Sequence, residues 1–113
     1  MIELPERAAM ADYQRYIHQL ETLHGWLDVD LIHTSFLLGE EVGELFKAIR
    51  RTEKLFLQTT ESSPEKEGVK QEVAEEIVDV FNYLLALANR LDIDVEAAFR
   101  AKNAHNQKRT WLA

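Results

Sequence analysis

The chain has 113 residues, and its 20 Asp and Glu against 13 Lys and Arg give a formal net charge of −7. This acidic balance argues against a broad interface with a nucleic-acid polymer, and the lack of cysteine excludes disulfides and thiolate metal sites. No apolar run approaches membrane-spanning length, and residues 1–6 lack the basic and apolar regions of a signal peptide. We therefore expect one domain over residues 1–113, located in the cytoplasm and not in a membrane.

Four helices are predicted, because only two prolines and four glycines interrupt long stretches in which apolar residues recur at helical spacing. The first helix is expected from Pro5 to Leu23, and Gly25 ends it. Its buried stripe combines aromatic and aliphatic residues: Met10, Tyr13, Ile17, Leu20 and Leu23.

The second helix is expected from a cap at Asp28 or Asp30 to Arg51, with an extension to Leu57 as the longer alternative. From the following residues to Gly68 the composition turns polar, which is typical of a surface connection.

Glutamates interrupt the apolar stripe of this second helix. The stripe repeats at about 100° per residue and consists of Leu37, Leu38, Val42, Leu45, Ala48 and Ile49. Glu41 projects into it, while Glu40 and Glu44 crowd the same side of the helix. A desolvated carboxylate is costly unless it is protonated, paired or bound to metal. Gly39 and Gly43 leave a bare strip, which predicts the close approach of another helix or a ligand.

The third helix is expected from Pro64 to Arg90, after a start signal at Ser62 or Ser63. Acidic residues border its broad apolar arc: Glu72, Glu76 and Asp79. Asp79 has a valine on each side in the sequence, so a charge again lies against a face that should pack.

A short fourth helix is expected after a cap at Asp92 or Asp94. Its inward face is predicted from its apolar residues: Val95, Ala98, Phe99 and Ala101. The helix leads into a basic tail.

Two matched acidic pairs, Glu41 with Glu44 and Glu76 with Asp79, converge if the apolar faces of the second and third helices pack together. Such a cleft of oxygen ligands suits a hard divalent cation, Mg²⁺ or Mn²⁺. The alternative is neutralisation of the carboxylates by lysine or arginine.

The usual substrate of an all-oxygen magnesium site is a phosphate chain, which needs basic or hydrogen-bonding groups. The tail offers such groups, although an ordinary solvated tail is the alternative. They are Lys102, Asn106, Lys108 and Arg109. Trp26, next to the helix-breaking Gly25, and Tyr83, on the acidic side of the third helix, are candidates to stack on a base, with core packing as the default for both.

The acidic motifs resemble a known signature. Glu40-Glu41-Val42-Gly43-Glu44 and Glu76-Ile77-Val78-Asp79 are similar to the Glu-Glu-x-x-Glu and Glu-x-x-Asp motifs of the MazG-like superfamily of all-α nucleoside triphosphate pyrophosphatases. The helix and turn over residues 80–94, and a Lys-x-x-x-Asn-x-x-Arg tail, extend the likeness to residues 37–109.

This resemblance implies a four-helix, bundle-like domain that hydrolyses a (deoxy)nucleoside triphosphate to a monophosphate and pyrophosphate, with Mg²⁺ as cofactor and Mn²⁺ as its substitute. Carried over by position, the metal ligands are Glu41, Glu44, Glu76 and Asp79, and the phosphate-binding residues are Lys102, Asn106 and Arg109. Glu40, on the more open side, is then the candidate to orient or deprotonate the attacking water, or to bind a further metal.

The resemblance also implies a homodimer or homotetramer with a part in nucleotide-pool housekeeping. The base preference stays open, because the loop between the acidic motifs is longer than in compact relatives and the tail ends in Thr110-Trp111. The alternatives are a narrower dUTP or phosphoribosyl-ATP pyrophosphatase, or a non-catalytic helical module that binds a metal or a partner.

Overall fold

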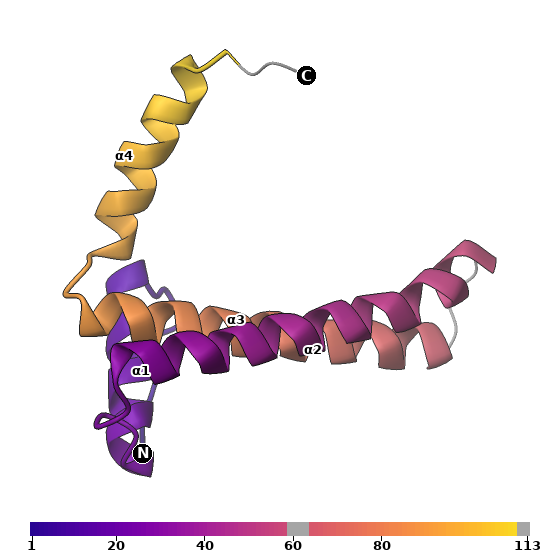
Figure 1. Cartoon of the computed structure of the whole chain (residues 1–113), viewed down its shortest axis with the longest axis horizontal. Coiled ribbons are helices and arrows are strands. Elements are labelled where there is room, and N and C mark those ends of the chain that lie inside the picture. The colour runs from indigo at the N-terminus through magenta and orange to yellow at the C-terminus, as the bar shows by residue number, and fades with distance from the viewer. Residues whose placement is uncertain (59–63, 111–113) are drawn as a thin grey trace. The chain divides into compact units, whose positions relative to one another are not determined.

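The computed structural model describes residues 1–58 and 64–110, and for residues 54–58 it describes the backbone alone. The described chain forms four helices, α1 (Met10–His24), α2 (Leu31–Gln58), α3 (Pro64–Arg90) and α4 (Val95–Lys108) (Figure 1). Within these ranges there is no strand, so the predicted all-α class with four helices is confirmed. None of the described helices combines the length and apolarity needed to cross a membrane.

Helix α1 starts later than its sequence predicts, at Met10 rather than at Pro5. The start is fixed by Asp12, whose Oδ2 accepts a hydrogen bond from the backbone N–H of Ala9 at 2.9 Å. This bond satisfies a donor at the helix N-terminus and holds the pKa of Asp12 below its ordinary value. At the other end, Gly25 takes a left-handed conformation with φ 72° that ends the helix, as predicted.

The caps of the later helices follow the sequence more closely. Asp30 Oδ1 accepts from the backbone N–H of His33 at 2.7 Å at the start of α2, and Asp94 Oδ1 accepts from that of Ala97 at 3.1 Å at the start of α4. Helix α3 begins at Pro64, as predicted, although its expected caps Ser62 and Ser63 lie outside the described residues.

The chain divides into two compact units. The first unit comprises Met1–Asp28 and Leu85–Ala113, and the second unit comprises Val29–Leu84. The long helix α3 therefore contributes its start to the second unit and its end to the first.

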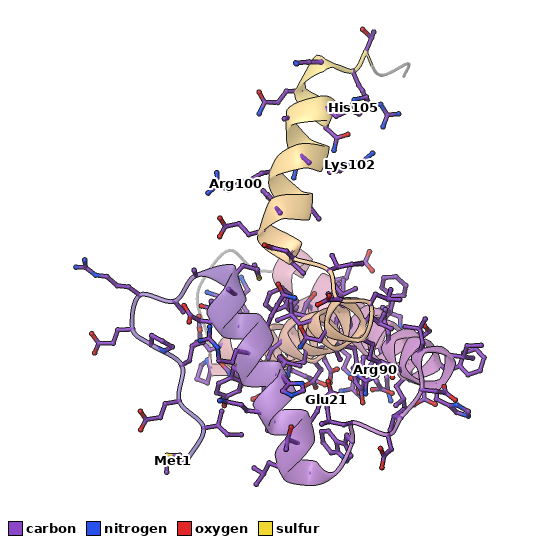
Figure 2. All side chains as sticks on the ribbon, turned by 90° about the vertical axis from the view of Figure 1, so that its left-hand side faces the viewer. Met1, Glu21, Arg90, Arg100, Lys102 and His105 are labelled. Carbon is purple, nitrogen blue, oxygen red and sulfur yellow. The ribbon has the colours of Figure 1, made fainter. Side chains whose placement is uncertain are left out.

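In the first unit, a buried ion pair joins α1 to the end of α3. Arg90 donates from Nη1 to Glu21 Oε1 at 3.0 Å and from Nη2 to Glu21 Oε2 at 2.6 Å (Figure 2). Arg90 Nη2 also donates to the backbone O of Trp26 at 3.0 Å. The side chains of Glu21 and Arg90 are 9% and 14% exposed, so this bidentate pair fixes the turn after α1 to α3.

Gln14 fixes the corner between α3 and α4 in the same unit. Its Nε2 donates to Asn89 Oδ1 at 3.1 Å and to the backbone O of Ile93 at 2.8 Å, and its Oε1 accepts from the backbone N–H of Val95 at 3.0 Å. Asn89 Nδ2 returns a bond to the backbone O of Gln14 at 2.8 Å. One side chain of α1 thus holds the first residue of α4.

The predicted inward face of α4 is wrong for the described chain. No residue of α4 is buried, Val95 is half-buried, and Ala98 and Ala101 are exposed. Phe99 is 65% exposed. Within the first unit, no described residue covers the apolar side chains of this helix beyond its first turn.

Candidate metal centre

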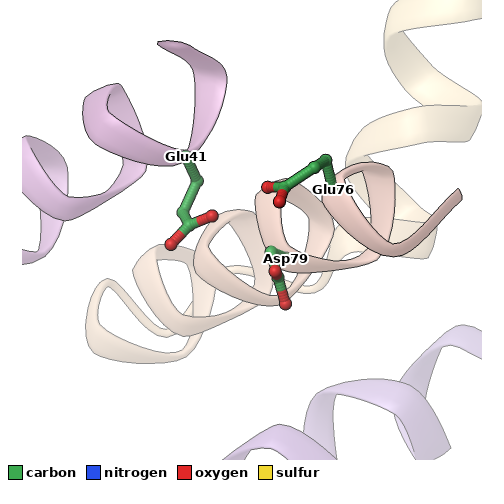
Figure 3. Close-up of side chains that lie close together, drawn as sticks. All are labelled: Glu41, Glu76 and Asp79. Atoms are coloured by element: carbon green, nitrogen blue, oxygen red, sulfur yellow. The ribbon is translucent and has the colours of Figure 1, made fainter. Parts of the chain in front are cut away.

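Three carboxylates from two helices meet in the second unit. Glu41 comes from α2, and Glu76 and Asp79 lie one turn apart on α3 (Figure 3). Each offers one oxygen atom, and these oxygens all lie within 4.8 Å of one another. Glu41 and Glu76 are half-buried, and Asp79 is exposed.

The cluster carries an electrostatic cost that falls on Glu41. Burial raises the pKa of the Glu41 carboxyl, and the neighbouring charges of Asp79 and Glu76, a hydrogen bond to Glu76 and the charge of Glu44 raise it further. Like charges held this close favour either a shared proton or a bound cation.

Glu76 supplies a second, independent observation. Its Oε2 atom is buried and has no hydrogen-bond partner within the described part of the chain. A buried carboxylate oxygen without a partner is costly, and ligation of a cation would satisfy it. The donor set consists of carboxylate oxygens, so it fits Mg²⁺ or Mn²⁺.

Of the four predicted ligands, the structure brings together Glu41, Glu76 and Asp79. Glu44 is exposed and lies outside this group, although its charge still raises the pKa of Glu41. Glu40 is exposed as well. The ligand roles and the role of Glu40 as a base stay predictions.

The predicted phosphate-binding residues lie in the first unit. Lys102 and Asn106 are one turn apart on α4, and Arg109 is the residue that caps its C-terminus. Lys102 is exposed on α4 (Figure 2), and the half-buried Asn106 donates from Nδ2 to Asn103 Oδ1 at 3.2 Å. Helical spacing thus places Lys102 and Asn106 on one side of α4, and the phosphate-binding role of all three residues stays a prediction.

The candidate base-stacking residues differ in exposure. The indole of Trp26 is stacked on the ring of His24, with centroids 4.5 Å apart and planes at 24°, and the residue is 49% exposed. Tyr83 on α3 is half-buried. Trp26 therefore keeps aromatic surface available to a ligand, and its contact with a base stays a prediction.

The structure adds a feature that the sequence did not predict. Arg51 Nη1 on α2 lies 2.5 Å from Glu72 Oε1 on α3, close in sequence to Glu76. The sequence contains only a weak indication of this ion pair, because opposite charges on polar helix faces are common and do not identify their partners.

The fold and the site together define a class of protein. It is an all-α chain in which two helices present clustered carboxylates suited to a divalent cation. A family model described as the MazG nucleotide pyrophosphohydrolase domain matches residues 33–110, so the chain belongs to the MazG nucleotide pyrophosphohydrolase family. The chain is also similar to the uncharacterized protein YvdC of Bacillus subtilis (strain 168). The two are 29% identical over 102 residues, which cover 89% of this chain and 92% of that protein.

Proposed function

We propose that this chain is a metal-dependent nucleoside triphosphate pyrophosphohydrolase that adds water across the bond between the α and β phosphates. The products are a nucleoside monophosphate and pyrophosphate. The observation that carries the proposal is the meeting of Glu41, Glu76 and Asp79 within 4.8 Å in a member of the MazG family.

These carboxylates would hold Mg²⁺, or Mn²⁺ as its substitute, together with Glu44. When bound, such a cation neutralises charge on the phosphate oxygens and orients the substrate. Glu40 is exposed next to Glu41, and we assign it the task of orienting the attacking water and accepting its proton. Lys102, Asn106 and Arg109 would bind phosphate oxygens, and Trp26 and Tyr83 would contact the base.

The biological role that fits this reaction is removal of unwanted nucleotides from the pool, by a chain that assembles as a homodimer or homotetramer. A chain restricted to dUTP or to phosphoribosyl-ATP would use the same carboxylates. The difference would lie in the groups that contact the base and the sugar.

The test is incubation of the full chain with a panel of canonical and modified nucleoside triphosphates in the presence of Mg²⁺ or Mn²⁺. We expect a monophosphate and pyrophosphate in equal amounts from at least one nucleotide, and the preferred nucleotide decides between a broad and a narrow substrate range. Release of orthophosphate instead would contradict the position of cleavage. Absence of products from every nucleotide, with the helical circular-dichroism signal intact, would overturn the proposal.

A pair of variants tests the site within this assay. Glu41→Gln is expected to abolish turnover because it removes a half-buried ligand. Glu53→Gln changes an exposed glutamate of the same helix and is the matched control, expected to keep full activity.

A further inference from the structure

The ion pair between Arg51 and Glu72 links α2 and α3 within the unit that holds the acidic cluster. Its two side chains are 52% and 39% exposed. Exposed ion pairs of this kind contribute little to stability, so a purely structural role explains it poorly. The guanidinium of Arg51 donates a hydrogen bond from Nη1 to Glu72 Oε1.

Arg51 lies on the face of α2 that also carries Glu40 and Glu44, next to the cluster. Residues spaced by four, three and four positions share one side of a helix, and this spacing relates Glu40, Glu44, Lys47 and Arg51. All four of these residues are exposed. The N-terminal half of this face is therefore acidic and its C-terminal half is basic. Arg51 lies about 10 Å beyond Glu44 along the helix axis.

The facing side of α3 matches this arrangement. Glu72 lies one helical turn before Glu76, and Asp79 follows one turn later. Because Glu41 meets Glu76 and Asp79 while the later Arg51 meets the earlier Glu72, the two helices run antiparallel here. Glu72, the partner of Arg51, lies one turn before Glu76, about 6 Å along the axis of α3. The guanidinium of Arg51 is therefore bonded to the carboxylate that lies next to the cluster on α3.

We propose that Arg51 is a phosphate-binding residue of this site, which exchanges the carboxylate of Glu72 for the terminal phosphate oxygens of a nucleoside triphosphate. A guanidinium presents a planar set of donors that fits carboxylate and phosphate alike, so one side chain can bind either group. The inference rests on the proposed function, because it takes the acidic cluster as the place where the triphosphate binds.

A competing role for Arg51 is that of a clamp that only holds α2 against α3. The two roles predict different behaviour when Glu72 is changed. If the pair is a clamp, loss of either side chain weakens the site in the same way. If Glu72 competes with phosphate for Arg51, its removal frees Arg51 and tightens phosphate binding.

The experiment compares Arg51→Gln and Glu72→Gln in the full chain, with the nucleotide that the wild type hydrolyses best. We expect Arg51→Gln to raise KM about tenfold with little change in kcat, because it removes a charge-assisted hydrogen bond. Glu72→Gln is expected to lower KM. Arg51→Lys is expected to give a KM between those of the wild type and Arg51→Gln, because lysine keeps the positive charge but lacks the planar set of donors. Arg50→Gln is the control, since Arg50 is an exposed neighbour on a different side of α2.

Calorimetric titration of each variant with pyrophosphate and Mg²⁺ gives a readout without turnover. The same order of affinities is expected: Glu72→Gln tightest, then wild type, Arg51→Lys and Arg51→Gln. Equal weakening by Arg51→Gln and Glu72→Gln, or an Arg51→Gln variant with unchanged KM and unchanged pyrophosphate affinity, would overturn the inference. A wild type without turnover would instead contradict the proposed function, and the titration would still decide the role of Arg51.

Discussion

Glu41 is the residue at which the proposed chemistry and the stability of the chain conflict. Its pKa is raised by burial and by the charges of Asp79, Glu76 and Glu44, so the folded chain binds this proton more tightly than the unfolded chain does. Ionisation of Glu41 therefore lowers the free energy of unfolding. This loss of stability is absent below the ordinary carboxyl pKa of 4.5 and develops as the pH rises through the raised pKa of the folded chain. It is complete only at a pH above the raised value.

The first prediction follows from the raised pKa of Glu41. In the presence of a chelator at neutral pH, Glu41→Gln should raise the melting temperature, because it removes one of the crowded charges. The gain should vanish as the pH falls below the ordinary carboxyl value, where the wild-type residue is protonated as well. Thermal unfolding followed by circular dichroism across a pH series measures both effects. A variant less stable than the wild type at neutral pH would contradict this account of the cluster.

The second prediction concerns metal binding by the same residue. Mn²⁺ should raise the melting temperature of the wild type, because a ligand that binds only the folded state stabilises it. Its affinity should fall as the pH is lowered from neutral, since protons compete for a carboxyl with a raised pKa. Titration of Mn²⁺ followed by its paramagnetic resonance measures the affinity, and Glu41→Gln should bind the ion far more weakly than Glu53→Gln. Equal binding by these variants would remove Glu41 from the ligand set.

Residue by residue, the sequence predicted the acids that lie against apolar faces and missed the pairs between polar faces. Glu41 interrupts an apolar stripe and Asp79 lies between valines, so the sequence alone identifies both as charged residues at positions where apolar residues are expected. Arg51 and Glu72 lie where charged side chains are ordinary, and only the antiparallel register of α2 and α3 brings them together. Register depends on the packing of whole helices, which periodicity alone does not determine.

At the level of elements, the buried, bidentate pair of Glu21 and Arg90 links α1 to the end of α3. Glu21→Gln would leave the guanidinium of Arg90 buried without a counter-charge. We expect it to lower the free energy of unfolding by about 3 kcal/mol. Urea denaturation measures the change. Arg15→Gln, which breaks the exposed pair with Asp12, is the control and should change the unfolding free energy little. A loss no larger than that of the control would show that the buried pair is dispensable.

The corner at Gln14 was not predictable from the sequence, because its partners Asn89, Ile93 and Val95 lie 75 to 81 residues away along the chain. Polar side chains on helices are usually solvated, and nothing local distinguishes this one. The start of α4, by contrast, was predicted from a cap at Asp92 or Asp94, of which the structure has Asp94, because a cap is a local interaction between near neighbours.

Gln14→Met tests this corner as the fourth prediction. Methionine matches the length of the side chain but can neither donate to Asn89 and Ile93 nor accept from Val95. The amides of the first turn of α4 should then exchange their hydrogens faster, because local opening of that turn costs less. Hydrogen exchange read by mass spectrometry measures the effect, with the α2 peptides as the internal reference. Unchanged exchange at the first turn of α4 would show that Asp94 alone holds it.

Many large apolar side chains among the described residues are exposed. On α2, large apolar side chains follow one face, with Ile32 64%, Phe36 67% and Phe46 65% exposed. Apart from its chain neighbours and the backbone of its own helix, a Cβ added to Gly39 or Gly43 would meet no described atom within 4 Å, so no other described element approaches the predicted bare strip. Phe36, Gly39, Gly43 and Phe46 share one side of α2 at helical spacing, and Glu41 points to the opposite side.

The last prediction is that this face joins copies of the chain in the expected dimer or tetramer. Light scattering coupled to size exclusion should give the wild type a mass of two or four chains, and Phe36→Ser combined with Phe46→Ser should shift it toward one chain. Tyr13→Ser changes an aromatic residue of α1 that is 38% exposed, and it is the control that should leave the mass unchanged. A wild type with the mass of one chain would contradict the prediction. Since Glu41 lies on the opposite side of α2, the dissociated variant should still bind Mn²⁺. If the dissociated variant binds Mn²⁺ but loses the turnover that the wild type and Tyr13→Ser keep, each active site needs residues from a second copy.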